Sequence, residues 1–219
     1  MKDTGLTYKP RNDDIMFVAG MHGNERLPVQ ALGENGIDFI LGNPRAYERN
    51  VRYTEQDLNA SFGLGDSSYE ARRAGEILDQ IPKDACAVDF HTTEKEPRPF
   101  AIVVDEKMIW LAARTGVERV VIMTHNIKEG HALINYRDGI SVEAGMHESL
   151  KSYAATLEIV KNIRGGMWHP VAVYEVYGTL NEPGVYKNFT AHADGFIPVL
   201  ANESAYERQG IFGLKAKRR

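Results

Sequence analysis

Short apolar runs alternate with longer amphipathic segments along most of the chain, and this alternation constrains the fold more than any other feature. The runs are rich in β-branched and aromatic residues and are bounded by Gly, Pro, Asp or Asn, as buried strands are. They lie at 15–20, 37–44, 86–90, 100–104, 119–123 and 139–145. These runs predict a series of short buried strands with turns between them.

The segments between the runs have the spacing of amphipathic helices. In 69–81, apolar residues follow i, i+3, i+4 and i+7, and 148–164 repeats this spacing. A further helix is expected after Asp105, which has the character of an N-cap, and Gly116 is expected to end it. Strands that alternate with helices predict an α/β domain with a largely parallel sheet.

The sequence changes character after residue 166. From there on it consists of short strand-like runs separated by Gly, Pro and Asn, without an amphipathic helical segment. This pattern predicts a small β-rich unit without helices. We therefore divide the chain into an α/β domain, 1–165, and a small C-terminal β-rich domain, 166–219. The basic end, 215–219, is typical of a frayed tail.

Composition argues against several classes of protein. The net charge is −4 and the pI is near 6.0, which predicts no electrostatic footprint for nucleic acid. No apolar run approaches the ~18 residues of a membrane helix, and 1–14 lacks the apolar stretch of a secretory signal. Because Cys86 is the only cysteine, no internal disulfide is expected and a cytoplasmic location is the simplest prediction.

His22 and Glu25 directly follow the first expected strand, in the turn GMHGNE. In open α/β sheets, ligands bind beyond the carboxyl ends of the strands, and imidazole and carboxylate are proper zinc ligands. The spacing alone is weak support, because His-x-x-Glu occurs again at His91 and Glu94. A polar turn without a metal is the alternative interpretation.

His91 strengthens the metal hypothesis because it follows another expected buried strand, 86–90. If both strands belong to one parallel sheet, His22, Glu25 and His91 meet at the same edge. Two imidazoles and a carboxylate, with a fourth position open, match a hydrolytic zinc site better than a closed structural one. Asp89 precedes His91 by two residues and either orients its ring or solvates the strand end.

Two further stretches carry polar residues near the expected strand ends. The segment 43–62 has no regular apolar period. An irregular loop of that length is typical of a functional site, although a solvated loop fits the same pattern. Glu143 ends an apolar strand among Val142, Ala144 and Gly145. Apolar surroundings raise the pKa of a carboxyl group, which suits a general base near neutral pH; a glutamate that reaches solvent is the alternative.

Five ordered stretches together resemble the succinylglutamate desuccinylase/aspartoacylase family. They are GMHGNE, NPRA…RYTEQDLNASF, VDFHTT, SVEAG and VLANESAY, and they run from residue 20 to residue 206. The resemblance implies a zinc carboxypeptidase-like fold, with a mixed, largely parallel central sheet, flanking helices and a small C-terminal β-rich unit that contributes to the substrate cleft. It also implies a zinc-dependent hydrolase that cleaves the amide bond of a small N-acyl compound.

The resemblance implies roles for particular residues of this chain. Three residues would hold one zinc ion per chain: His22, Glu25 and His91. Two would be catalytic, with Glu143 as the general base that activates water and Arg52 as the group that polarises the scissile carbonyl. Two would bind substrate: Asn59, from the same stretch as Arg52, and Tyr206, from the C-terminal unit.

One position departs from the family pattern. The family has an arginine directly after the asparagine, where it helps to hold a substrate carboxylate, and this chain has Ala60. A methyl group cannot replace a bidentate guanidinium, so the substrate is expected to differ from N-acetylaspartate and succinylglutamate. The sequence does not place the arginines that could replace it, nor two nearby histidines, relative to the pocket: Arg49, Arg72, Arg73, Arg137, His131 and His147.

Two other functions remain open at this point. A zinc carboxypeptidase acting on peptides is disfavoured by Ala60, because the free carboxylate of the peptide would lose its anchor. A non-catalytic protein that binds a metal or ligand on the same fold is disfavoured by Glu143, because pure binding needs no positioned base. The expected partner is a small-molecule substrate, with no nucleic acid and no membrane, and the sequence is compatible with a homo-oligomer.

Overall fold

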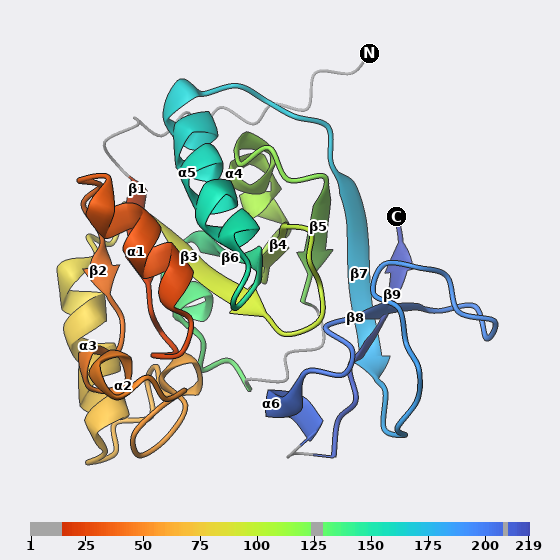
Figure 1. Ribbon diagram of the computed structural model, residues 1–219, viewed down its shortest axis with the longest axis horizontal. Helices are drawn as coiled ribbons and strands as arrows, with labels where there is room; N and C mark the ends of the chain where they lie inside the picture. Colours follow the sequence, from red (N-terminus) through yellow and green to blue (C-terminus); the bar gives the residue numbers. More distant parts are fainter. Residues whose placement is uncertain (1–14, 124–128, 208–209) are drawn as a thin grey trace.

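The computed structural model describes residues 15–123, 129–207 and 210–219, and one nine-stranded sheet runs through this part of the chain (Figure 1). Its spatial order is β2-β1-β3-β6-β4-β5-β7-β9-β8. The strands are β1 (Ile15–Ala19), β2 (Ile40–Leu41), β3 (Cys86–Thr93), β4 (Phe100–Val103), β5 (Arg119–Ile122), β6 (Gly139–Met146), β7 (Ala172–Thr179), β8 (Ile197–Val199) and β9 (Leu214–Arg218). Each predicted apolar run overlaps one of the strands β1 to β6.

Most neighbouring strands of the sheet are parallel. β2, β1, β3 and β6 run in one direction, and β4, β5 and β7 are also parallel to one another. β4 is antiparallel to β6, and β9 is antiparallel to both β7 and β8. The predicted mixed, largely parallel sheet is therefore confirmed. Because β1, β3 and β6 are parallel neighbours, their carboxyl ends lie at one edge.

Helices cover both faces of the sheet (Figure 1). One face packs against α1 (Arg26–Glu34), α4 (Ile109–Arg114) and α5 (Leu150–Gly165), whose apolar side chains share a core cluster with the strands. The opposite face packs against α3 (Tyr69–Gln80), which begins where the Ser68 hydroxyl accepts a hydrogen bond from the backbone N–H of Ala71. The helices predicted at 69–81, at 148–164 and after Asp105 are confirmed.

Alternation along β3 decides which of its residues reach the site. Cys86, Val88 and Phe90 point into the core cluster beneath α1 and α5. The intervening Asp89 and His91 therefore lie on the opposite face. All of β3 is buried, so these two polar side chains are held in an environment that solvent hardly reaches.

The strands beyond residue 166 extend the same sheet. β7 pairs with β5 in parallel, and β9 joins β7 to β8. The division into two domains at residue 165 stays a prediction. One prediction for this region is wrong, because it contains a helical turn, α6 (Ser204–Glu207). Four residues are too few to show a helical period in the sequence.

Two loop predictions also need correction. The basic end, 215–219, was expected to fray, yet it supplies most of β9, because Leu214 and Ala216 are buried against the neighbouring strands. The segment 43–62 is not wholly irregular, since it contains α2 (Pro44–Arg49) and a 3-10 turn (Leu58–Ala60). Asn43 is the N-cap of α2, and its side chain accepts a hydrogen bond from the backbone N–H of Ala46.

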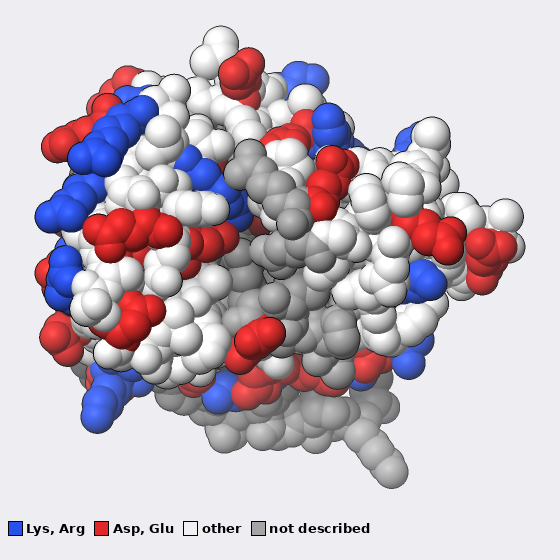
Figure 2. All heavy atoms as spheres, turned by 90° about the horizontal axis from the view of Figure 1, so that it is seen from below, with Lys and Arg blue, Asp and Glu red and all other residues white. Residues whose placement is uncertain are grey.

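The described helices are all too short or too polar to cross a bilayer. On the face that Figure 2 shows, Lys and Arg side chains gather mainly along one side, and Asp and Glu side chains are spread across the face. This mixture agrees with the small negative net charge of −4. Residues 1–14, on which the expectation about a secretory signal rests, lie outside the described residues.

Candidate functional site

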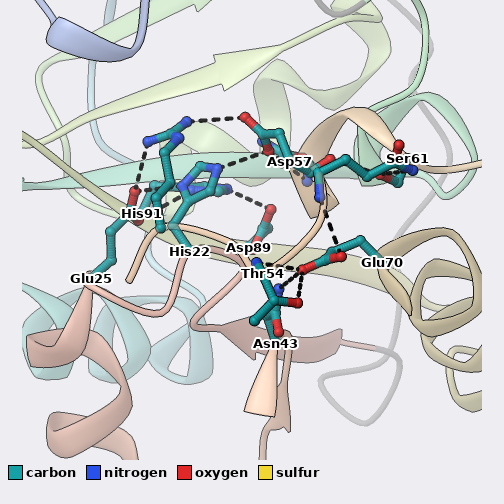
Figure 3. A network of polar contacts seen from close by, with 12 residues as sticks. His22, Glu25, Asn43, Thr54, Asp57, Ser61, Glu70, Asp89 and His91 are labelled. Atoms are coloured by element: carbon teal, nitrogen blue, oxygen red, sulfur yellow. Dashed lines mark hydrogen bonds and ion pairs between the residues drawn. The ribbon is translucent and has the colours of Figure 1, made fainter. Parts of the chain in front are cut away.

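The carboxyl ends of three parallel strands bring the predicted site residues together. β1 leads into the turn with His22 and Glu25, β3 carries His91 and β6 carries Glu143. His91 and Glu143 are register partners in the β3–β6 pair, so both side chains point to the same face of the sheet. Figure 3 shows His22, Glu25 and His91 side by side at this edge.

Two glycines fix the turn that follows β1. Gly20 has a φ of 75°, a left-handed conformation that favours glycine, and it redirects the chain after the strand. A Cβ on Gly23 would lie 2.0 Å from the backbone of Ala46, so only glycine lets this turn pack against α2. The N–H of Gly23 donates to the carbonyl of Arg52 at 3.2 Å. The turn with His22 is thereby held against the segment that carries Arg52.

His22, Glu25 and His91 form a compact, buried cluster. One oxygen of Glu25 lies 2.6 Å from Nδ1 of His22, and the other lies 3.3 Å from Nδ1 of His91. One possible ligand atom from each residue lies within 4.8 Å of the other two. Two imidazole nitrogens and one carboxylate are a suitable donor set for zinc. The three residues could therefore hold one metal ion.

Two further carboxylates hold the far nitrogen of each imidazole ring. Oδ2 of Asp89 lies 2.7 Å from Nε2 of His91, and Oδ1 of Asp57 lies 3.0 Å from Nε2 of His22 (Figure 3). In metal sites such a carboxylate fixes the ring orientation and makes the imidazole a stronger ligand. Asp89 therefore contacts the His91 ring, in agreement with the interpretation that it orients this ring and not with the one that it solvates the strand end.

Burial and neighbouring charges shift the pKa values of the cluster residues in opposite directions. Burial raises the pKa of Glu25, but His22 and His91 lower it well below its usual range. Burial lowers the pKa of His91, but the charges of Asp89 and Glu25 raise it well above its usual value. Without a metal, these charges favour the protonated form of His91, and a cation that binds here competes with that proton.

Glu143 faces the cluster from the neighbouring strand. Burial raises the pKa of Glu143 to about 8, and the nearby Glu25 and Glu203 act in the same direction, while His91 opposes them. Its Oε2 atom is buried and has no hydrogen-bond partner among the described residues. A carboxyl group with this pKa can gain and lose a proton near neutral pH, as the apolar surroundings in the sequence predict.

A buried carboxylate, Glu70 of α3, organises the segment that carries Arg52 (Figure 3). Glu70 accepts hydrogen bonds from the N–H and hydroxyl of Thr54, at 2.8 and 2.7 Å. The side chain of Asn43 and the N–H of Gln56 also donate to it, at 3.1 and 3.3 Å. Burial raises the pKa of Glu70, but these hydrogen bonds lower it below its usual value. The segment is thus tied to α3.

Arg52 lies between this segment and the cluster. Its guanidinium group is 3.2 Å from Asp57 and 3.9 Å from Glu25. Burial lowers the pKa of Arg52, but these two carboxylates raise it above its usual value. The group therefore keeps its charge. A fixed positive charge beside the possible metal ligands can stabilise negative charge on a substrate oxygen.

A cavity of about 50 Å³ opens over the cluster, and every predicted site residue contributes to its wall. The wall includes the cluster itself, both predicted catalytic residues, Arg52 and Glu143, and both predicted substrate-binding residues, Asn59 and Tyr206. A larger cavity of about 430 Å³ shares Arg52 and Ala205 with it. The structure therefore brings all seven predicted residues to one place.

Asn59 and Tyr206 each present a polar group at this cavity. Oδ1 of Asn59 is buried without a hydrogen-bond partner among the described residues. Burial, with the charge of Glu143, strongly raises the pKa of Tyr206, so its phenol keeps its proton. The pair can therefore offer both hydrogen-bond acceptors and a hydrogen-bond donor to a bound molecule.

Sequence reasoning missed two acidic residues of the site. Asp57 contacts His22 and Arg52, as described above. Glu203 lines the cavity beside Tyr206, and burial raises its pKa to about 7. Both lie within stretches that resemble the family, which was the available signal.

Several residues that the sequence left open lie outside the cavity wall. His147 contacts the Thr92 hydroxyl through Nδ1 at 2.6 Å, and His131 contacts the carbonyl of Phe62 at 2.8 Å. The candidate arginines do not line the cavity either: Arg49, Arg72, Arg73 and Arg137. Among the described residues of the wall, Arg52 is the only Lys or Arg.

Comparisons with known proteins show the family of the chain. The family model described as the succinylglutamate desuccinylase/aspartoacylase catalytic domain matches residues 12–165. A probable aspartoacylase of Prochlorococcus marinus (strain MIT 9301) is 38% identical over 102 residues, covering 36% of this chain and 34% of that protein. A succinylglutamate desuccinylase of Pseudomonas paraeruginosa (strain DSM 24068 / PA7) is 28% identical over 183 residues, covering 72% and 54%. The chain thus spans about a third to a half of these curated relatives.

The fold is also similar to that of solved structures. The crystal structure of murine aminoacylase 3 superposes with a TM-score of 0.73 at 17% sequence identity, covering 97% of each chain. At this level of identity the similarity shows the fold alone. The expected zinc carboxypeptidase-like fold is therefore confirmed.

Proposed function

Since the chain belongs to the succinylglutamate desuccinylase/aspartoacylase family, we propose that it hydrolyses the amide bond of a small N-acyl compound. One observation carries this proposal: His22, Glu25 and His91 converge, and Glu143 and Arg52 lie in the wall of the same cavity. A site that only binds a ligand needs no positioned base, which argues against a non-catalytic function.

The donor set supports one zinc ion as the cofactor. His22 and His91 would bind it through Nδ1, because these are the nitrogens that face Glu25, and Glu25 would bind through its carboxylate. When bound, zinc is a Lewis acid that lowers the pKa of water from ~15.7 to ~7 and polarises a carbonyl. Asp57 and Asp89 keep the two imidazole rings oriented for this task.

Glu143 is the proposed general base. Its carboxylate accepts one proton from the attacking water and then donates it to the nitrogen of the leaving amine. Amide and water thus give a carboxylic acid and an amine, and Glu143 returns to its starting state. Burial raises the pKa of Glu143, which makes its carboxylate a stronger base for the proton of the water. Arg52 stabilises the negative charge that develops on the carbonyl oxygen.

Asn59 and Tyr206 are the proposed substrate-binding residues. The unpartnered Oδ1 of Asn59 would accept a hydrogen bond from the substrate, and the phenol of Tyr206 would donate one. Ala60 takes the position where the family has its carboxylate-binding arginine, and Arg52 is the only described Lys or Arg in the wall. We therefore expect an N-acyl amine, or an N-acyl amino acid other than N-acetylaspartate and succinylglutamate.

Metal analysis of the purified protein, followed by a substrate screen, tests the proposal. We expect about one zinc per chain and turnover of at least one N-acetyl or N-succinyl amine. His91→Ala should lose both the zinc and the turnover. Turnover of peptides alone would indicate a zinc carboxypeptidase, and zinc without turnover would indicate a binding protein. A wild-type protein that binds no zinc would reject the proposal.

The remaining expectations concern the setting of the enzyme. The single cysteine, Cys86, is buried in β3. We propose a cytoplasmic location because a chain with one cysteine can form no internal disulfide. The proposed partner is the small-molecule substrate, and a homo-oligomer stays compatible with the chain.

A further inference from the structure

Two glutamates on distant segments, Glu94 and Glu203, each accept hydrogen bonds from the segment that carries the other, beside the cavity. The carboxylate of Glu94 accepts hydrogen bonds from the N–H of Ser204, at 3.1 Å, and from its hydroxyl. In return, the carboxylate of Glu203 accepts hydrogen bonds from the N–H of Glu94, at 2.9 Å, and of Lys95, at 3.3 Å. We call these four residues the clamp: Glu94, Lys95, Glu203 and Ser204.

The clamp joins two parts of the site that are 110 residues apart in sequence. Glu94 follows His91 by three residues, just beyond the end of β3. Ser204 opens α6, and Tyr206 lies two residues further on, in the cavity wall. The clamp therefore connects the segment just after a possible metal ligand, His91, to the segment that carries Tyr206.

The segment before α6 needs such an anchor because its backbone is strained. Leu200 and Asn202 have φ angles of 51° and 59°, in the left-handed region that residues other than glycine rarely adopt. A residue in this conformation persists only where the surroundings hold it. Leu200 also lines the cavity, so the strained stretch is itself part of the site.

Glu94 has no part in the metal cluster, although it repeats the His-x-x-Glu spacing of His22 and Glu25. Its carboxylate is occupied by Ser204, and burial, which would raise the pKa of Glu94, is outweighed by these hydrogen bonds, which lower it. Both carboxylate oxygens of Glu94 thus accept a hydrogen bond from Ser204, at the start of α6.

We propose that Glu94 is a positioning residue, which acts through the clamp to hold Tyr206 in place over the metal cluster. This inference rests on the proposed function, because Tyr206 is taken there as a residue that binds the substrate. Glu94 itself contacts neither substrate nor metal in this proposal. Its removal should release the strained segment and let Tyr206 leave its position.

Hydrogen–deuterium exchange tests the clamp without any activity. Glu94→Ala should speed amide exchange in the peptide around Ser204 by at least about tenfold, because two hydrogen bonds from that residue are lost. Glu94→Gln should give a smaller increase, since one amide oxygen can still accept one of them. Glu182→Ala, at an exposed glutamate in a loop of the same region, is the matched control. Unchanged exchange in Glu94→Ala would overturn the proposal.

A double-mutant cycle tests the action through Tyr206. We expect Glu94→Ala to lower kcat by about 10- to 100-fold, the scale of a misplaced catalytic or binding group. In a Tyr206→Phe background, the same change should lower kcat by less than about twofold, because Glu94 then has no hydroxyl left to position. Zinc content should stay unchanged throughout. Losses that multiply in the double mutant would show that Glu94 acts independently, which would overturn the proposal.

The two tests separate this inference from the proposed function. If the wild-type protein turns over no amide, the proposed function fails, and the exchange experiment still decides whether the clamp holds α6. If the wild-type protein is active, faster exchange with unchanged kcat in Glu94→Ala would leave the clamp as a purely structural feature. That outcome would reject Glu94 as a positioning residue while leaving the proposed function intact.

Discussion

Asp89 lies 2.7 Å from Nε2 of His91 and leaves the other ring nitrogen, Nδ1, facing Glu25 at 3.3 Å. The two residues are two apart on β3 and therefore share one face of the sheet. Strand geometry alone thus brings the carboxylate to the ring. His22 has the same arrangement, with Asp57 on its far nitrogen, but that carboxylate comes from a separate loop.

The contact between Asp89 and His91 predicts a loss of zinc affinity in Asp89→Asn. The amide keeps the shape of the side chain but removes the charge that orients the ring, so zinc affinity should fall about 10- to 100-fold. Competition with a chromophoric chelator measures this change. Asp38→Asn, at an exposed position, is the control and should leave the affinity unchanged. Equal affinities for all three proteins would contradict a role for Asp89 in the site.

Glu143→Gln should separate catalysis from metal binding. The amide cannot accept the proton of the attacking water, so the rate should fall by at least ~10²-fold, the low end for removal of a general base. Because Glu143 is not among the proposed ligands, zinc content should remain at the wild-type value. Steady-state turnover and metal analysis of the same samples check both points. A rate within a few-fold of wild type would reject the proposed role.

Arg52→Ala should act on the transition state more than on substrate binding. Loss of a donor to the developing oxyanion costs ~3 kcal/mol, or somewhat more than 10²-fold in kcat. Arg52→Lys keeps a charge but not the planar guanidinium, and it should recover only part of the rate. Comparison of kcat and KM for the three proteins is the measurement. A change confined to KM would mean that Arg52 binds the ground state of the substrate.

Glu70→Gln should destabilise the fold and disorder the segment that carries Arg52. One amide oxygen cannot satisfy the donors that now share the carboxylate, and the loss should cost about 3 kcal/mol of unfolding free energy. Urea denaturation measures it. Glu76→Gln, on the same helix and in an exposed ion pair with Arg73, should cost less than about 1 kcal/mol. Similar costs for the two variants would contradict the organising role of Glu70.

The pKa of Glu70 predicts how the difference in unfolding free energy between wild type and Glu70→Gln depends on pH. Because the folded protein lowers the pKa of Glu70 below 4.5, the carboxylate contributes stability that is fully present above that value. The contribution is lost as the pH falls through the lowered pKa of the folded state. The stabilities of wild type and Glu70→Gln should therefore converge in acid. A difference that stays constant down to low pH would contradict the lowered pKa.

The strands and helices around the sheet could be predicted because their patterns are local. The apolar runs and the helical spacing at 69–81 and 148–164 each reflect burial of one face, which a short stretch of sequence records. The pairing of β7 with β5 joins residues about fifty positions apart and leaves no such local record. For that reason the strands after residue 166 could be expected, but their place in the sheet could not.

The sequence could identify candidate site residues from their spacing and their place after the strands, but spacing alone could not show which of them meet in space. The pairs His22/Glu25 and His91/Glu94 have the same spacing, yet Glu25 joins the cluster and Glu94 binds Ser204. A turn can bring residues i and i+3 together, whereas His91 lies in an extended strand. Glu70 also escaped notice, because an acidic residue in the first turn of a helix usually stabilises the helix terminus at the surface.

The last prediction concerns Ala60, the position that sets this chain apart from the family pattern. Ala60 ends the 3-10 turn that also carries Asn59, and Asn59 lines the cavity. Ala60→Arg would place a guanidinium group next to the bound substrate, where it can hold a carboxylate in a bidentate manner. We expect kcat/KM for N-acetylaspartate to rise about tenfold or more, the scale of a charged hydrogen bond.

The same change should leave an uncharged N-acetyl alkylamine unaffected, since that substrate offers nothing for the new charge to bind. Ala60→Met is the matched control, because it adds a long side chain without charge and should not favour N-acetylaspartate. Kinetics of the three proteins with both substrates gives the ratio that decides. Because the proposed ligands and base are untouched, zinc content should be equal in all three. A ratio that stays at its wild-type value in Ala60→Arg would mean that another group already determines which carboxylates the site accepts.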